Sequence, residues 1–482
     1  MSEEVKKKRG CLRFVFRWTF RLAVVAMLFL VCAFLYIFWD ALYNRFYHFP
    51  KVAEAWDEIR SDRVEPSLDD GWTEYRGICH SHSELSHDSV VPFPDIIEAA
   101  QKADVSFICM SDHCVEDADG KIADYSLQLN GIYLDILFVP GFEMSNGFMP
   151  WGLPYDTVLD CNEEPEALAQ QIVDLGGALF IAHSEEERQW ELPQISGMEI
   201  YNIHTDFKDE NLPALFPDII LSLKKYPDLV MRQLFDRQTD ILAHWDELNK
   251  DRYMAGIAAN DAHQNTGYQG YYTDADTFLL TGTSDAHAAE FKLGTVSRTL
   301  LRLAFGPLEP GERLFRIDLD PYERSLRFVN NHVLAEDLTE EAIVNALKSG
   351  RSYIAFDMIA DARGFVFFAD DGSRMYVMGE TAPMSEGLVL RAGSPNRVRF
   401  TLVADGEVID TQEGREYEYQ VPYPGKYRLE AELPVLDEWV PWVYTNPIVV
   451  GSGAPDDAVD EPAQPGAEDN AEDEPNVTRF EI

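Results

Sequence analysis

Between about residue 72 and residue 356, short apolar runs alternate with segments whose apolar residues recur at helical spacing. The runs expected to form strands cover residues 74–79, 105–110, 134–139, 178–182, 198–201 and 254–259. Helical patterns occupy 94–103, 165–175 and 232–250, and one at 339–349 stops at Gly350. Strand–helix alternation over this length indicates an α/β unit with parallel strands, either layered or closed into a barrel.

After residue 356 the pattern changes to short alternating runs separated by Gly, Pro and Asp turns. Such runs at 364–368, 398–403, 416–421 and 426–429 predict an all-β module over 357–450, with a sandwich as its architecture. Residues 451–482 carry ten acidic residues against one arginine and few apolar residues to bury. We expect this acidic tail to be disordered.

The N-terminus has the pattern of a membrane anchor. Residues 1–21 are strongly basic and precede an uncharged apolar stretch at 22–39, which is about one bilayer long. A cleavable signal peptide is the alternative, but bulky aromatics run to the end of the stretch and no small-residue cleavage site follows. The sequence predicts a single-pass anchor in the cell (inner) membrane, a cytoplasmic tail at 1–21 and a spacer at 40–71. The remaining chain would then lie on the periplasmic or extracytoplasmic side.

Composition narrows the possible partners. The chain has 482 residues and a formal net charge of −44, which should repel the phosphate backbone of nucleic acid. Its six cysteines include no CxxC pair, so neither a zinc ribbon nor a small disulfide scaffold is indicated.

The densest group of candidate functional residues is the stretch from His80 to Asp88. Nine of the eleven histidines lie between His80 and His287. On an extended backbone, residues i and i+2 point to the same side, so His80 and His82 are placed to hold one ion together. Two surface histidines near a loop are the alternative interpretation of this pair.

The same arrangement recurs after the following expected strands. Four of these strands, at 105–110, 134–139, 178–182 and 254–259, are followed by a His, Asp or Glu, and in a barrel the carboxyl ends of the strands converge on one face. The residues concerned are His113, Glu143, His183, Asp261 and His263. Recurrence at five strand ends favours a shared metal site over chance placement.

Mixed imidazole and carboxylate ligands suit zinc, manganese or iron. Such ions lower the pKa of bound water and supply a nucleophile at neutral pH, and a pair of ions can clamp a phosphoester. Arg188 follows His183 and is a candidate for contact with a phosphate oxygen, although a solvated arginine beside Glu185, Glu186 and Glu187 is the alternative.

In this order, the motifs resemble the PHP (polymerase and histidinol phosphatase) superfamily over roughly residues 75–265. The matching segments are the 80–89 stretch, Ser111-Asp112-His113, Ala182-His183 and Asp261-Ala-His263. Segments 245–248, 260–264 and 346–353 resemble the branch that includes carbaryl-type hydrolases. The resemblance implies a distorted (β/α)7 TIM-like barrel over 72–356 that holds two or three divalent ions.

The resemblance also implies a ligand set. One ion would be bound by His80, His82, Glu143 and Asp261. Another would be bound by Asp88, His113 and His263. Glu143 would bridge to a third ion that His183 also binds.

The chain departs from the family pattern at this third site. The family usually supplies a further histidine between the positions of Glu143 and His183, and this chain has none there. The segment offers as possible substitutes Asn146, Asp156, Asp160 and Cys161.

Several nearby residues have competing interpretations. His87 and Asp88 compete for one ligand position, and the spacing favours Asp88. Asp285 and His287 form a second Asp-x-His without a strand directly before it, which favours a loop over a substrate-facing role.

Other candidates have a structural and a functional interpretation. His204 could approach the site, but a structural role is favoured, and Glu199 is a candidate for orienting a ligand. Cys79 and Cys114 abut the first two motifs, where small buried residues are common.

The leading hypothesis is therefore a membrane-anchored, metal-dependent hydrolase that acts on a small-molecule phosphoester or related ester. His80, Asp261 and His263 are expected at the reacting centre. The alternatives are a weakly active or inactive metal-binding barrel that serves as an envelope binding or scaffold module, and a chain whose main function belongs to a glycan- or protein-binding β module.

Overall fold

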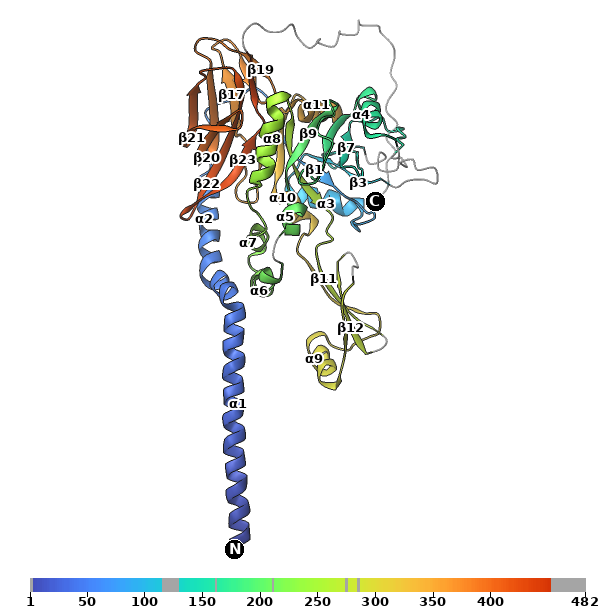
Figure 1. The fold of residues 1–482 in the computed structure, drawn as a ribbon, viewed down its shortest axis with the longest axis vertical. Coiled ribbons are helices and arrows are strands. Elements are labelled where there is room, and N and C mark those ends of the chain that lie inside the picture. The colour runs from blue at the N-terminus through green and yellow to red at the C-terminus, as the bar shows by residue number, and fades with distance from the viewer. Residues whose placement is uncertain are drawn as a thin grey trace.

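The computed structural model describes residues 3–114, 130–160, 163–209, 212–273, 276–283 and 287–451 (Figure 1). The predicted acidic tail lies outside these residues after Gly451, and so do Asp285 and Cys161.

A long helical rod leads into the body. Helix α1 (Glu3–Tyr43) continues through one π-helical turn, η1 (Asn44–His48), into α2 (Phe49–Ser61). One N-terminal helix is thus long and apolar enough to span a membrane. The part expected to be a spacer is largely helical, and α2 buries Phe49, Val52 and Trp56 against the body.

Six parallel strands form the centre of the α/β unit, in the spatial order β8–β9–β10–β1–β2–β5. Their bounds are β1 (Thr73–Ser81), β2 (Phe107–Cys109), β5 (Ile136–Val139), β8 (Ala178–Ile181), β9 (Ile195–Asn202) and β10 (Ala255–Ala262). All six strands predicted from the apolar runs are present. Since these strands are parallel, their carboxyl ends lie at one edge of the sheet.

The two outer edges of this arrangement approach each other. Strand β7 (Phe148–Trp151) pairs antiparallel with β8, and an isolated bridge joins Gly141, just after β5, to Trp151. Short strands β3 (Asp112–His113) and β6 (Phe142–Glu143) extend β2 and β5 as a parallel pair, and β4 (Gly131–Tyr133) adds an antiparallel edge to β5. The unit is mixed α/β, and its classification as a (β/α)7 barrel stays a prediction.

Three helices lie where the sequence predicts them, namely α3 (Phe93–Ala103), α4 (Pro165–Asp174) and α11 (Glu340–Ser349). The sequence did not predict α5 (Ile203–Asp209), α6 (Leu212–Ser222) or α10 (Tyr322–Phe328). Gly350 ends α11 in the left-handed conformation, as expected for a C-terminal glycine.

The single helix expected over 232–250 is wrong. The structure has α7 (Pro227–Arg232) and α8 (Thr239–Asp251), separated by an irregular segment. Asp206 accepts hydrogen bonds from the Asp236 backbone and the Gln238 side chain, so this segment is tied to α5 and cannot continue the helix.

The C-terminal module is all β, but its sheet is continuous with the α/β unit. Its strands are β17 (Val366–Asp370), β18 (Met375–Val377), β19 (Thr381–Pro383), β20 (Val389–Ala404), β21 (Glu407–Gln420), β22 (Gly425–Val435), β23 (Glu438–Thr445) and β24 (Ile448–Gly451). Strand β15 (Asn330–Ala335) pairs with β1 and with β16 (Ser352–Ala355), which in turn pairs with β23. Main-chain hydrogen bonds therefore cross the expected boundary at residue 357.

An insertion between β10 and α10 forms a small unit of its own, the 267–318 module. It contains β11 (Gly267–Tyr272), β12 (Thr277–Gly282), β13 (His287–Lys292), α9 (Thr295–Phe305) and β14 (Arg313–Asp318), with strand order β13–β12–β11–β14. Figure 1 shows it projecting from the body in the same direction as α1. The sequence favoured a loop at Asp285 and His287, but His287 is the first residue of strand β13.

A buried ionic network lies where β1 meets β15 and β16. His332 Nδ1 is 2.5 Å from Glu74 Oε1, and its Nε2 is 2.9 Å from Asp357 Oδ2. The Tyr353 hydroxyl donates to Glu74 at 2.6 Å. Burial opposes the charge of His332, but the two carboxylates outweigh this effect and raise its pKa to about 9.

This pKa predicts a pH-dependent stability. The folded-state pKa of His332 exceeds the unfolded value, so its contribution is complete below about pH 6.5 and lost as pH rises through about 9. We expect His332→Gln to lower the free energy of unfolding by roughly 2–4 kcal/mol at pH 6.5, because it leaves the Glu74 carboxylate without its cationic partner, whereas Asp357 keeps Arg76. Urea unfolding of the full chain in detergent would measure this. A difference from the parent chain that stays constant up to pH 10 would contradict it.

Candidate metal centre

The candidate ligands lie at the carboxyl edge of the parallel strands. Three of them have a backbone that non-glycine residues rarely adopt, with φ of 64° at His80, 50° at His183 and 46° at Asp261. The β1–β10 register shifts at His80, between Cys79 and Ser81. Bulged, strained strand ends re-aim side chains, and such strain persists where the surrounding structure holds it in place, often at functional sites.

Four ligand atoms converge at the centre of this edge. His80 Nε2 and His82 Nε2 are 3.0 Å apart, and each lies 3.3 Å from Asp261 Oδ1. Glu143 Oε2 is 3.2 Å from His80 Nε2 and 3.4 Å from His82 Nε2. Ligands around a tetrahedral ion with bonds of about 2.0–2.1 Å lie about 3.3 Å apart, so the spacing fits such an ion.

The hydrogen-bonding state of these atoms also fits a metal. Asp261 Oδ1 and His263 Nε2 are buried and make no hydrogen bond of good geometry, although charged neighbours lie at ion-pair distance from each atom. A buried polar atom without a partner costs free energy unless another group satisfies it. Divalent ions bound in the central and second groups would satisfy these two atoms.

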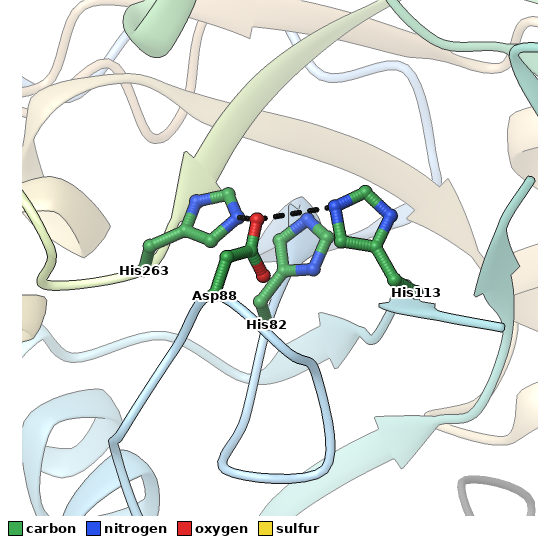
Figure 2. Close-up of side chains that lie close together, drawn as sticks. All are labelled: His82, Asp88, His113 and His263. Atoms are coloured by element: carbon green, nitrogen blue, oxygen red, sulfur yellow. Dashed lines mark hydrogen bonds and ion pairs between the residues drawn. The ribbon is translucent and has the colours of Figure 1, made fainter. Parts of the chain in front are cut away.

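A second group lies beside the first (Figure 2). Asp88 Oδ2 is 3.0 Å from His263 Nε2 and 3.2 Å from His113 Nε2, and the rings of His82 and His263 stack at 3.9 Å. His113 Nδ1 lies 3.4 Å from Glu143 Oε2, which links this group to the first. The structure thus brings together Asp88, His113 and His263, the set that the family resemblance implies.

A third group forms on the other side of Glu143 and Asp261. His183 Nε2 lies 3.2 Å from Glu143 Oε1 and 3.6 Å from Asp261 Oδ2. His204 Nδ1 is 3.1 Å from the same Asp261 oxygen. The structure therefore places His204, for which a structural role was favoured, at the cluster.

The position of His204 bears on the histidine missing from the third site. It follows β9 directly, and strand-end placement was the signal that could have identified it. Of the substitutes considered from the sequence, Asn146 accepts a hydrogen bond from the Phe148 backbone within a turn. His204 instead supplies an additional imidazole beside Asp261 and His263.

Neighbouring groups orient the histidines. His80 Nδ1 donates to Glu199 Oε1 at 2.5 Å, His82 Nδ1 donates to the Ser86 hydroxyl at 3.1 Å, and His263 Nδ1 donates to the Asp261 carbonyl at 2.8 Å. Each bond leaves the Nε2 atom facing the cluster. This is how proteins fix the tautomer and direction of metal-binding histidines.

Buried charge dominates the electrostatics of the cluster. Burial opposes ionisation of Glu143, but His80 and His183 outweigh it and hold the pKa of this carboxyl well below its usual range. Burial likewise disfavours the charged form of His183, while Glu143 and Glu185 raise its pKa to about 10. Without an ion, the carboxylates are therefore neutralised by protons on histidines.

The remaining sequence candidates lie at different distances from the cluster. Asp88 points into it, whereas His87 is exposed and only its ring approaches His113, at 4.7 Å between centroids. The Arg188 side chain is buried, donates from Nε to the carbonyls of Ala182 and His183, and pairs with Glu186. This geometry favours support of the His183 strand end, and contact of Arg188 with substrate stays a prediction.

The two cysteines beside the motifs contact the backbone or the core. Cys79 is fully buried in the sheet, and Cys114 Sγ lies 3.4 Å from the Glu143 carbonyl oxygen. The side chains of Asp285 and His287 lie outside the described part of the chain.

A small cavity of about 20 Å³ lies beside Asp261 and His204. Its wall has an apolar part that includes Ile203, Met231, Leu234 and Leu319. Its polar part includes Asn265, Thr266 and Asp320. This volume holds about one water molecule, which is too small for an organic ligand.

Comparison with known proteins gives little. No protein-family model matches the chain, and no curated protein matches its sequence. Among solved structures, the chain is similar to a two-domain protein from Bacteroides vulgatus ATCC 8482 that contains a predicted PHP-like metal-dependent phosphoesterase. The TM-score is 0.33 and the sequence identity 13%, over 80% of this chain and 99% of that one. The functional assignment therefore depends on the residues and geometry of this chain.

The cluster predicts a specific loss of metal. We expect His80→Ala combined with His82→Ala to reduce bound divalent metal to less than half of the parent content, because it removes two of the four central ligands. His87→Ala is the matched control and should retain the full content. Elemental analysis of the purified full chain in detergent measures both, and equal content in all three proteins would refute the site.

The third group makes a separate prediction. Protons held by His183 and its neighbours must leave when metal binds, so the apparent affinity should rise with pH between 6 and 8 and binding should release protons. His204→Ala should weaken binding of the most weakly held ion by about 10–100-fold, with the central ion unaffected. Calorimetric titration in buffers of different ionisation enthalpy separates the two effects, and binding that is independent of pH would contradict the prediction.

Proposed function

We propose that this chain is a divalent-metal-dependent phosphoesterase anchored to the membrane by α1. The observation that carries the proposal is the convergence of His80, His82, Glu143 and Asp261 at tetrahedral ligand spacing. In this proposal the remaining ligands are Asp88, His113, His183, His204 and His263. The ions are two or three in number and are zinc, manganese or iron.

The way the carboxylates are shared supports phosphoester chemistry. Glu143 directs Oε2 to the central and second groups and Oε1 to His183, while Asp261 directs Oδ1 to His80 and His82 and Oδ2 to His183 and His204. Carboxylates that serve neighbouring groups with opposite oxygens are suited to hold ions a few ångströms apart. When bound, such ions supply a water nucleophile of lowered pKa and neutralise phosphoryl charge.

The chain's own residues position the reaction. The bulged ends of β1 and β10 hold His80 and Asp261 towards the cluster, and Glu199 fixes the direction of His80. Asn202 donates to Glu199 at 2.9 Å and so supports that orientation from β9.

The location of the site is also proposed. The basic residues before the apolar stretch favour a cytoplasmic N-terminus, and the body would then face the periplasmic or extracytoplasmic side. Nucleic acid remains an unfavoured partner at a net charge of −44. The carbaryl-type branch of the PHP superfamily and a (β/α)7 barrel stay the proposed finer classification.

A hydrolysis assay tests the function. Metal-loaded full chain should hydrolyse members of a panel of phosphomonoesters and phosphodiesters, and chelation should abolish the activity. His80→Ala should lower kcat/KM by at least about a hundredfold, and Glu199→Gln by about 10–100-fold through the orientation of His80. Val408→Ala on the β module is the matched control and should have parental activity.

The same assay separates the alternatives. A chain that binds its full complement of metal but hydrolyses no phosphoester or related ester, with His80→Ala indistinguishable from the parent, would overturn the proposal in favour of a binding or scaffold role.

A further inference from the structure

Helix α9 presents an apolar stripe to the outside of the 267–318 module. Val296, Leu300 and Leu303 are 75%, 61% and 79% exposed, and their i, i+4, i+7 spacing places them on one face. None of the residues in α9 is buried. An exposed apolar stripe on a solvent-facing helix is unfavourable unless something covers it.

The opposite face of α9 attaches the helix to its own sheet. Phe305 stacks on Phe315 of β14 with ring centroids 6.0 Å apart, and Arg298 Nη2 pairs with Asp276 Oδ2 at 2.8 Å. The residues that hold α9 in place therefore differ from the exposed stripe. Folding of the module does not account for the stripe.

The local charge is opposite to that of the chain. Residues 291–308 contain Lys292, Arg298 and Arg302 and no acidic residue, although the whole chain has a net charge of −44. Phe291, which is half exposed, adds a bulky apolar side chain just before the helix. An apolar stripe with basic residues around it is the pattern of a helix that lies in a membrane interface with anionic lipids.

The position of α9 agrees with this pattern. In Figure 1 the yellow module extends in the direction of α1, and α9 lies at the height of the second half of that helix. This half contains the apolar stretch 22–39. On the body itself, α6 contacts α1 and exposes Phe216 and Ile220.

The body cannot swing freely about the span. The rod from α1 to α2 is helical throughout, and Arg60 of α2 donates to the carbonyls of Met358 and Ile359. Asn396 of the β module in turn donates to the Ile59 carbonyl. The position of the body relative to the apolar stretch is therefore set by packed contacts.

We propose that α9 is a second membrane-binding element, which inserts its Val296–Leu300–Leu303 stripe into the outer leaflet of the bilayer that α1 spans. The occupant of the stripe is lipid, and the exposed basic residues Lys292 and Arg302 contact anionic headgroups. The inference extends the proposed anchor and does not depend on the proposed hydrolysis. It makes the protein doubly attached, by a spanning helix and by an interfacial one.

Photo-crosslinking in native membranes tests this proposal. A benzophenone amino acid replaces Leu300 in the full chain, Val408 as an exposed control at the start of β21, or Phe29 as a control within the span. We expect lipid adducts at Leu300 and Phe29, with a yield at least about tenfold lower at Val408. Adducts are identified by mass spectrometry of the labelled peptides.

The other outcomes overturn the proposal in distinguishable ways. Crosslinks from Leu300 to a second copy or to another protein would assign the stripe to a protein partner. Lipid adducts at Phe29 without any at Leu300 would leave α1 as the only anchor. Adducts at neither position would also remove the membrane-spanning role of α1, while the hydrolysis assay would stay unaffected.

A charged pair of substitutions tests the stripe itself. With the probe at Val296, Leu300→Glu combined with Leu303→Glu should reduce the lipid adduct several-fold, because charge on the stripe opposes insertion. Thr295→Glu combined with Thr299→Glu adds the same charge beside the stripe and should reduce the yield of the lipid adduct less. Full metal content in both proteins would show that they fold. An equal loss of the lipid adduct in both proteins would refute insertion through the apolar stripe.

Discussion

The buried carboxylates of Glu143 and Asp261 are the constraint on which the α/β unit depends. Both side chains are buried at the carboxyl edge of the parallel strands, where an isolated ionised carboxylate would be very unfavourable. The surrounding histidines offset the free-energy cost of burying these charges, because each carboxylate oxygen faces at least one imidazole nitrogen. The strand order, the bulges and the orienting hydrogen bonds all serve to bring cationic or metal-binding nitrogens to these two groups.

The cluster and the domain interface solve the same problem in different ways. At the interface, both ring nitrogens of His332 are paired, one with Glu74 and the other with Asp357, so this imidazole is fully satisfied by protein groups. At the strand edge, Asp261 Oδ1 and His263 Nε2 make no hydrogen bond of good geometry, so the network is incomplete by itself. The first arrangement is suited to stability and the second to binding an ion.

Much of this architecture could be predicted from the sequence. The six central strands follow from short apolar runs, and the ligands follow from polar residues at their ends, because position along a strand is a local property. The break between α7 and α8 could not be predicted, since it depends on Asp206 of another helix. A structural role was favoured for His204 because it lies in the first turn of α5 and not in a strand, and only the fold shows its proximity to Asp261. The 267–318 module was missed because its short runs of mixed polarity resemble loops until their pairing is known.

The continuous helix from α1 to α2 has a mechanical consequence. Each residue of an α-helix adds 1.5 Å of length and about 100° of rotation. The number of residues between the apolar stretch and α2 therefore sets both the height and the rotation of the body relative to the apolar stretch. A single inserted residue would barely lift the body, yet it would turn the 267–318 module to a different side of the rod. The rotation accumulated along this helix, more than its length, therefore sets which side of the body faces the bilayer.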